Sequence, residues 1–457
     1  MPINTAAAAS RRRQRGHGYS YPSWILLNND ANIGSRSNNT TAVSKGRDNL
    51  TIEASFWPAL PPLPSNRFVH CAGATFPRGS KILSTAEDLL LFRVPVAVGP
   101  PPNFIKFDDC DYIIYRAGGT PSLTRIPNPK PNFYDGDVGL LSRAGDLFTV
   151  AALVAKSTKN EYTLHRFDSE VGNWTLKTVS LEAPRKPYPV KIPKNALRLN
   201  HHITTTVITL GGEAGTMGWV DLWSGILLYD LSHEDPGRPM LRHMPLPLPV
   251  DLEKRVTELG CPRSSRGIAS VIKHGEPCLK LAELKTIEEC LPYDDIETDL
   301  PCYTVNDWAV TTWSNTKICY SDSFDDWKED FTVWASKIII SDTVRSELLA
   351  SGLLHRKPSQ DGEEMEVLAL QNLAVSEPTP SLNGEEEVVY LMARPKYFHP
   401  MAWALAIDIK NRTLLDVAKF GRDDSGRLSG VTYRSSTISK YMTANPSSNK
   451  GKLVADE

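Results

Sequence analysis

Residues Gly218–Leu231 read GWVDLWSGILLYDL, and after a polar turn the chain continues with PMLRHMPLPLP at Pro239–Pro249. Both segments are rich in large apolar and aromatic residues, which are typical of strands that pack against a neighbouring sheet. The residues between the two segments are polar or are glycine and proline, which suit the backbone of a tight turn. The two segments therefore predict short, aromatic-rich antiparallel strands joined by turns.

Segments of this kind recur along the whole chain. Further strands are predicted at Ile25–Leu27, Thr51–Phe56, Phe68–Cys71, Leu89–Val98, Tyr112–Arg116, Leu123–Ile126, Leu147–Ala155, Tyr162–Phe167, Trp174–Leu181, Ile203–Leu210, Trp308–Trp313, Lys317–Tyr320, Phe331–Trp334, Lys337–Ile340, Glu366–Leu370, Val388–Ala393, Trp403–Ile409 and Thr413–Phe420. Only short helices are predicted, at Asp251–Leu259, Pro277–Cys290 and Asp342–Leu354. The 34 prolines and 29 glycines are scattered, and helix breakers at this density disfavour long helices.

Many short strands separated by turns predict an all-β architecture. A β-propeller or a propeller-like ring of short antiparallel sheets, with about five to seven blades, is the expected form, and stacked β-sandwiches are the alternative. A few short helices are expected in insertions. Residues 1–18 are predicted to be a disordered basic leader, residues 19–442 a single large all-β domain, and residues 443–457 a disordered tail.

Four hairpins share one plan, in which a strand ends at an aspartate, a polar turn follows, and the next strand opens with a large apolar residue. The aspartates are Asp168, Asp230, Asp322 and Asp408. They are 62, 92 and 86 positions apart, whereas propeller blades usually repeat about every 40–50 residues. The pattern is compatible with a repeat that carries insertions, and also with ordinary turn chemistry.

The overall charge excludes a general attraction to anionic partners. With 51 basic and 53 acidic residues the net charge is −2, so nucleic acid is an unlikely partner. No apolar run approaches the roughly 18 residues of a membrane-spanning helix, and the start lacks the apolar region of a secretory signal. The seven cysteines have no CxxC spacing and predict reduced thiols in a cytoplasmic or nuclear protein that is not secreted.

Clusters of like charge occur in three places. Arg11, Arg12, Arg13 and Arg15 are compatible with a nuclear or organellar address and with a flexible basic leader. Residues 283–299 and 361–387 are strongly acidic and are predicted to be inserted loops. Such loops form either a solvated face or a docking surface for a basic partner.

No catalytic motif was found, because GxGxxG, GxxxxGK[ST], GxSxG and HExxH are all absent. The glycine-rich run at 211–218 lacks the Lys of a phosphate-binding loop and is predicted to be a turn between blades. His274-Gly-Glu276, followed by Pro301-Cys302, imitates the zinc deaminase pattern, but Val305 stands where the second Cys ligand belongs. We therefore predict no catalytic, cofactor-binding or metal-binding residue, and no cofactor.

Two further patterns have structural explanations. His201 and His202 are adjacent in a predicted strand, so their side chains would point to opposite faces, one buried and one exposed. The ten tryptophans lie mostly inside alternating strands, which predicts that they pack between sheets rather than stack on bases or sugars.

GWVDLWSGILLYDL and PMLRHMPLPLP resemble the plant family called domain of unknown function 1618. SYPSWILLNND at Ser20–Asp30, FVHCAG at Phe68–Gly73, and the segment Trp308–Trp334 resemble other phrases of the same family. The resemblance spans residues 20–440, with a family core at about 200–340. The family is similar in style to F-box-associated β-propellers, although this chain has no F-box-like helical segment. The resemblance implies a fold and brings no catalytic residue.

The biochemical function is therefore unknown from the sequence. The leading hypothesis is a non-enzymatic module that binds a protein partner through a loop-rich face. The alternative is an enzyme with its active site at the mouth of a propeller channel. Three or more convergent His, Asp, Glu or Arg side chains at that mouth would favour the enzyme, and a scattered or apolar lining would favour binding.

Overall fold

The computed structural model describes residues 21–74, 79–95, 110–182, 201–232, 240–249, 261–294, 301–318, 321–354, 356–358, 365–367, 369–397, 399–421 and 432–442. The predicted leader at 1–18, the predicted tail at 443–457 and the predicted helix at Asp251–Leu259 lie outside these residues.

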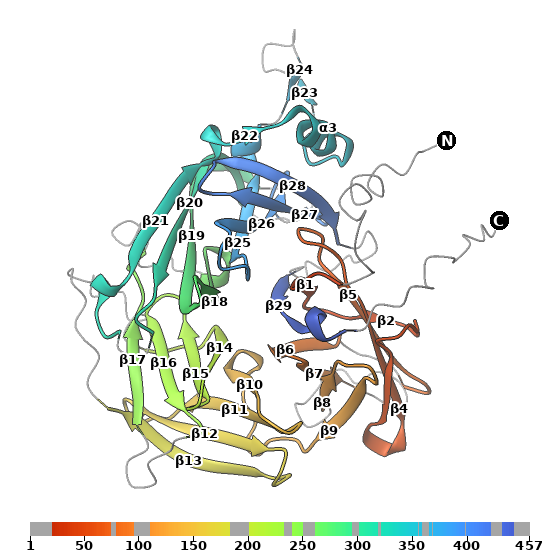
Figure 1. Ribbon diagram of the computed structural model, residues 1–457. Helices are drawn as coiled ribbons and strands as arrows, with labels where there is room; N and C mark the ends of the chain where they lie inside the picture. Colours follow the sequence, from red (N-terminus) through yellow and green to blue (C-terminus); the bar gives the residue numbers. More distant parts are fainter. Residues whose placement is uncertain are drawn as a thin grey trace, which may run out of the picture.

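Six groups of consecutive strands, which we call sheets I to VI, form most of the described structure (Figure 1). Sheet I contains β1 (Ile25–Asn28), β2 (Asn32–Ile33), β3 (Ala42–Lys45), β4 (Thr51–Trp57) and β5 (Asn66–Cys71). Sheet II contains β6 (Lys81–Ala86), β7 (Leu89–Pro95), β8 (Cys110–Arg116) and β9 (Ser122–Ile126). Sheet III contains β10 (Val138–Ser142), β11 (Phe148–Ala155), β12 (Glu161–Asp168) and β13 (Trp174–Leu181).

The second half of the chain repeats this plan. Sheet IV contains β14 (Thr206–Gly211), β15 (Thr216–Asp221), β16 (Gly225–Asp230) and β17 (Met240–Pro245). Parallel pairing of β13 with β17 joins sheets III and IV into one eight-stranded sheet. Sheet V contains β18 (Arg266–Lys273), β19 (Glu276–Asp294), β20 (Pro301–Asn315) and β21 (Lys328–Trp334). Sheet VI contains β25 (Ala374–Pro380), β26 (Val388–Arg394), β27 (Ala402–Asp408) and β28 (Thr413–Phe420), with β22 (Ile339–Ile340) at its edge. A separate short hairpin is formed by β23 (Arg356–Pro358) and β24 (Met365–Val367).

The sheets follow one another around a ring (Figure 1). The first strands of sheets II to VI, which are β6, β10, β14, β18 and β25, contact each other in that order and line the centre. The ring closes where β29 (Tyr433–Ser436), near the end of the chain, pairs antiparallel with β1 near its start. The all-β prediction is confirmed, and the sheets are arranged in a ring (Figure 1).

The helix and loop predictions around residue 280 are wrong. Pro277–Cys290 lies inside the long strand β19, and residues 283–294 of the predicted acidic loop continue that strand. Residues Cys278–Leu284 are buried because β19 runs between β18 and β20 and packs against a neighbouring sheet, so tertiary packing overrides the local helical preference. The helix predicted at Asp342–Leu354 is confirmed as α3 (Asp342–Ala350), capped by the side chain of Ser341.

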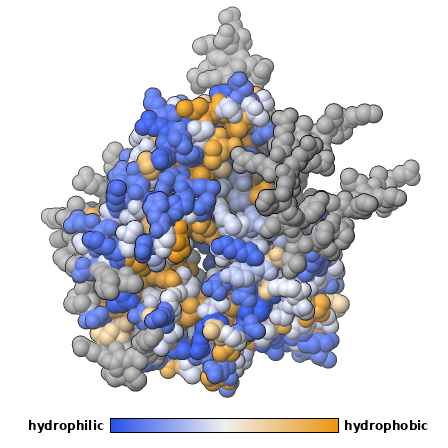
Figure 2. Space-filling view, in the orientation of Figure 1, coloured by the Kyte–Doolittle hydropathy of each residue, from blue (hydrophilic) through white to orange (hydrophobic). Residues whose placement is uncertain are grey.

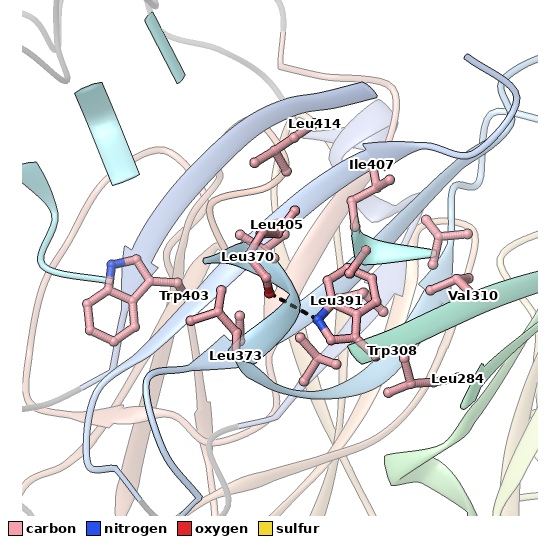
Figure 3. Close-up of a cluster of buried hydrophobic side chains, with 14 of the residues drawn as sticks. Leu284, Trp308, Val310, Leu370, Leu373, Leu391, Trp403, Leu405, Ile407 and Leu414 are labelled. Carbon is pink, nitrogen blue, oxygen red and sulfur yellow. Dashed lines mark hydrogen bonds between the residues drawn. The ribbon is translucent and has the colours of Figure 1, made fainter. Parts of the chain in front are cut away.

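Four tryptophan indoles tie neighbouring sheets together. Each indole N–H donates to a backbone carbonyl that belongs to the next sheet or to the segment leading into it. The pairs are Trp174 with Pro127 (2.7 Å, sheets III and II), Trp219 with Asp137 (2.8 Å, IV and III), Trp327 with Pro245 (2.8 Å, V and IV) and Trp308 with Leu370 (3.1 Å, V and VI). Figure 3 shows the last of these bonds inside the apolar cluster between sheets V and VI.

The two junctions of sheet I use other contacts. Between sheets I and II, the buried guanidinium of Arg67 donates to the hydroxyl of Ser80 at 2.9 Å and lies over the ring of Phe92. Between sheets I and VI, Trp24 packs edge-on against Tyr390 with 5.3 Å between ring centroids. Each neighbouring pair of sheets in the ring is thus joined by a large side chain, which is buried at every junction except that of sheets II and III, where Trp174 is half-buried.

Glycine allows the backbones of sheets V and VI to approach closely. A Cβ atom at Gly267 on β18 would lie 1.7 Å from the carbonyl oxygen of Pro378 on β25. The neighbouring backbone has little freedom to move away, because β25 is hydrogen-bonded within sheet VI. Gly267 is therefore required by packing against sheet VI.

The substitution Gly267→Ala should destabilise the protein by about 3 kcal/mol, because the added methyl group overlaps a backbone carbonyl. Gly119→Ala is the matched control, since a Cβ there meets nothing within 4 Å, and it should change stability by less than about 0.5 kcal/mol. Urea unfolding of both variants measures the difference. Equal urea concentrations at the unfolding midpoints of the two variants would show that the backbones of β18 and β25 can separate to accommodate the methyl group.

Candidate functional site

A central cavity of about 610 Å³ lies where the first strands of the sheets meet. Its walls come from β6, β10, β14, β18, β25 and β29, and Figure 2 shows the surface hollowed near the centre of the ring. The volume is typical of small-molecule sites, which usually range from about 300 to 1,000 Å³. The cavity is therefore the first candidate site.

Glu377 on β25 is the most unusual residue of the cavity wall. Its backbone has φ 54°, in the left-handed region that a non-glycine residue rarely adopts, at an irregularity between Ser376 and Thr379 in the pairing with β26. Burial raises the pKa of its carboxyl to about 7, although Arg263 and Arg394 oppose that rise. The carboxyl thus changes charge near neutral pH inside the cavity.

Two arginines, Arg263 and Arg434, line the cavity together with Glu377, and Arg263 lies close enough to the Glu377 carboxyl to lower its pKa. Arg434 on β29 has a buried Nε without a hydrogen-bond partner in the described part of the chain. Burial, and to a smaller extent repulsion by Arg263, lower the pKa of Arg434 to about 9, and attraction to Asp135 opposes this fall. Arg263 belongs to the short 3-10 turn Pro262–Ser264, and neither arginine forms an ion pair with a described residue.

The other two arginines of the cavity wall are engaged. Arg266 donates to the carboxylate of Glu283 and to the carbonyl of Leu222, each at 3.0 Å. Arg143 lies 3.4 Å from the carboxylate of Asp168. Positive charge in the cavity is therefore concentrated at Arg263 and Arg434.

The glycine run at 211–218 forms one mouth of the cavity and not a junction between sheets. Gly211, Gly212 and Gly215 have φ values of 70°, 72° and 60°, which form the tight turn between β14 and β15. The predicted turn is confirmed, whereas its placement between blades is wrong, because both strands belong to sheet IV. Glycine-rich turns join strands within one sheet and also connect successive sheets. Only the pairing of β14 with β15 shows which kind of turn this is.

The zinc-like residues do not come together. His274 is exposed in the β18–β19 turn and faces Glu385, with 3.0 Å between Nδ1 and Oε2, while Cys302 lies at the far end of the β19–β20 hairpin. Within the described ranges, no group of three or more His, Cys, Asp and Glu side chains is arranged to hold a metal ion. His201 is exposed and His202 is buried, as predicted, although both precede β14 instead of lying in a strand.

The aspartate hairpins occupy equivalent places in three sheets. Asp168, Asp230 and Asp408 each end the third strand of a meander, in sheets III, IV and VI. In sheets III and IV the aspartate also accepts a hydrogen bond from a threonine at the start of the second strand, Thr149 or Thr216. Asp322 lies in the corresponding connection of sheet V but beyond the end of β20. These hairpins are therefore structural repeats and not a site.

A second candidate site is the outer part of the β19–β20 hairpin, residues 284–294 and 301–308, which we call the ribbon. Strand β18 pairs with β19 only as far as Glu283, and β21 pairs with β20 only from Ala309. Beyond these points the two strands pair with each other and, among the described residues, with no further strand. Ile287, Tyr293 and Tyr303 on the ribbon are 42%, 61% and 39% exposed.

Comparison with known proteins identifies the region that contains β19 and β20. Residues 219–390, from β15 to β26, match the family model described as "Protein of unknown function (DUF1618)". The match covers less than half of the chain. The resemblance inferred from Gly218–Leu231 is thus confirmed, and this family has no established activity. No curated protein matches the chain, and none of the helices in the described residues is long and apolar enough to span a membrane.

The pKa of Glu377 gives a testable pH dependence. Because the folded-state pKa is raised above the usual value of 4.5, the neutral carboxyl stabilises the fold fully below about pH 4.5, and this stability is lost as the pH rises through about 7. Glu377→Gln should therefore gain roughly 1–3 kcal/mol relative to the native chain between pH 5 and pH 8. Urea unfolding at several pH values tests this, and a difference that does not change with pH would contradict the buried carboxyl.

Proposed function

We propose that this DUF1618 chain is a protein-interaction module built on a six-bladed β-propeller, and that the ribbon is its docking element. The observation that carries this proposal is the projection of paired strands beyond β18 and β21, with exposed Tyr293 and Tyr303. Exposed strand edges accept an added strand from a partner, whose backbone then continues the sheet. Exposed tyrosines supply contact area at such interfaces.

The charge of the ribbon indicates the chemistry of its partner. The segment 284–294 contains three acidic residues, Glu288, Glu289 and Asp294, and one basic residue, Lys285. Glu288 already accepts a hydrogen bond from the Tyr397 hydroxyl at 2.7 Å. An extended partner segment with Lys or Arg side chains would complement the carboxylates of Glu289 and Asp294, and electrostatic attraction would accelerate its association. We therefore favour a basic, extended peptide of a protein partner, and the charge balance of the chain gives no support to nucleic acid.

We place this function in the cytoplasm or the nucleus. Six cysteines in the described part of the chain are free thiols, and the buried Cys71, Cys110 and Cys278 are among them. Free thiols are typical of reducing compartments. Fluorescent tagging of the full chain in cells tests this placement.

The double substitution Glu289→Lys with Tyr293→Ser should abolish partner capture, because it reverses charge and removes an anchor on the ribbon. Quantitative affinity purification with the full chain as bait measures this, with Glu170→Lys in the exposed β12–β13 turn as the charge-matched control. Partners that depend on the ribbon should fall at least tenfold in the double variant and persist in the control. Identical partner sets for the native chain and both variants would contradict the proposal.

An enzyme in the central cavity is the second candidate function. Glu377, Arg263 and Arg434 converge there, which meets the criterion of three charged side chains at the channel. A carboxyl group whose pKa lies near 7 is suited to general base catalysis at neutral pH. If this function is correct, Glu377→Gln should lower turnover of a phosphate-ester or carboxylate-ester substrate by at least a hundredfold. Equal turnover by the native chain and Glu377→Gln across a panel of such esters would exclude it.

A further inference from the structure

Arg263 and Arg434 bring positive charge to the central cavity, where Glu377 is a nearby carboxyl group. Arg263 and Arg434 line the same cavity, repel each other, and form no ion pair with a described residue. Both arginines are half-buried in the cavity wall, and a guanidinium that has lost part of its water is stabilised by a hydrogen-bonded anion. By contrast, Arg266 in the same wall has two partners at 3.0 Å. The cavity wall therefore presents two guanidinium groups that make no ion pair with a described residue and are influenced at longer range by Glu377 and Asp135.

We infer that the central cavity binds a small ligand carrying a doubly charged oxyanion group, of the phosphate-ester or dicarboxylate class, between Arg263 and Arg434. Guanidinium groups match such oxyanions in geometry, because two parallel N–H donors meet two oxygens. A doubly charged group neutralises both arginines at once and removes their mutual repulsion. The cavity volume of about 610 Å³ leaves room for the rest of a small metabolite.

The position of the two arginines makes the site rigid. Arg434 lies on β29, which is held to β1 by four residue pairs where the ring closes. Arg263 precedes β18, whose close contact with β25 depends on Gly267. The two guanidinium groups thus come from two separate elements that face the same cavity. A preorganised pair of donors binds an anion without the entropy cost of ordering long side chains.

Glu377 makes the affinity depend on pH. The titratable and charged groups around its carboxyl are Arg263, Arg394, Tyr433 and Arg434. When protonated, the carboxyl donates a hydrogen bond to an oxyanion, and when ionised it repels the anion and competes for the arginines. The left-handed backbone of Glu377 costs about 1–3 kcal/mol, and such strain is often retained at ligand sites. Anion binding should therefore weaken as the pH rises through about 7.

Isothermal titration calorimetry of the full chain tests the site, with sulfate and malonate as the probes. Sulfate keeps its two charges between pH 6 and 8, so any pH dependence belongs to the protein. We expect saturable binding that weakens at least fivefold from pH 6 to pH 8 in the native chain and stays nearly constant in Glu377→Gln. Preference for sulfate indicates a phosphate ester, and preference for malonate indicates a dicarboxylate.

Charge-matched variants decide whether the two arginines are responsible. Arg263→Gln and Arg434→Gln should each weaken binding at least tenfold, whereas Arg125→Gln, which removes an arginine paired with Asp111 outside the cavity, should change it less than twofold. Where Arg434→Gln does not fold, Arg434→Lys and Arg263→Gln carry the test. Absence of saturable binding to the native chain, or equal weakening by Arg125→Gln, would overturn the inference. Because the ribbon variants leave the cavity unchanged, failure here is distinct from failure of the interaction proposal.

Discussion

The ring depends on hydrogen bonds that cross from one sheet to the next. Four indole N–H groups, from Trp174, Trp219, Trp308 and Trp327, donate to carbonyls that belong to a neighbouring sheet or to the segment leading into it. A tryptophan can do this because its ring fills the apolar space between two sheets while its one polar atom reaches a backbone acceptor. A phenylalanine of similar shape would leave that acceptor buried and unpaired. The indoles therefore orient the sheets as well as packing them.

Rigid junctions allow the centre of the ring to be polar. The first strands line the cavity with apolar residues such as Leu141, Ile208 and Ile268 as well as with polar ones. They carry residues such as Thr206, Ser270 and Ser435 there, together with charged groups. The strained backbone at Glu377 survives for the same reason, because β25 is held by β26 on one side and by Gly267 on the other. Stability is supplied by the junctions, and the cavity is free to serve a ligand.

The sequence predicted the outer strands well and missed most of the inner ones. Strands such as β11 and β27 alternate large apolar residues between turns, whereas β6, β10, β18, β25 and β29 were not predicted. Strand β29 reads YRSS and β25 contains two prolines, so neither has an apolar pattern of period two. These strands are stabilised by contacts with segments far away in the sequence, and they face the cavity. A short stretch of sequence around each strand does not reveal either feature.

The same limit explains why no motif revealed the cavity residues. Arg263, Glu377 and Arg434 are separated by 114 and 57 positions and lie on three different elements. Each is unremarkable in its own segment, since an arginine before a strand is normally a solvated surface residue. Only closure of the ring by β1 and β29 brings Arg434 next to Arg263. The position of Arg434 in the cavity depends on the pairing of β29 with β1. A ligand that binds Arg434 would therefore stabilise the conformation in which these two strands are paired.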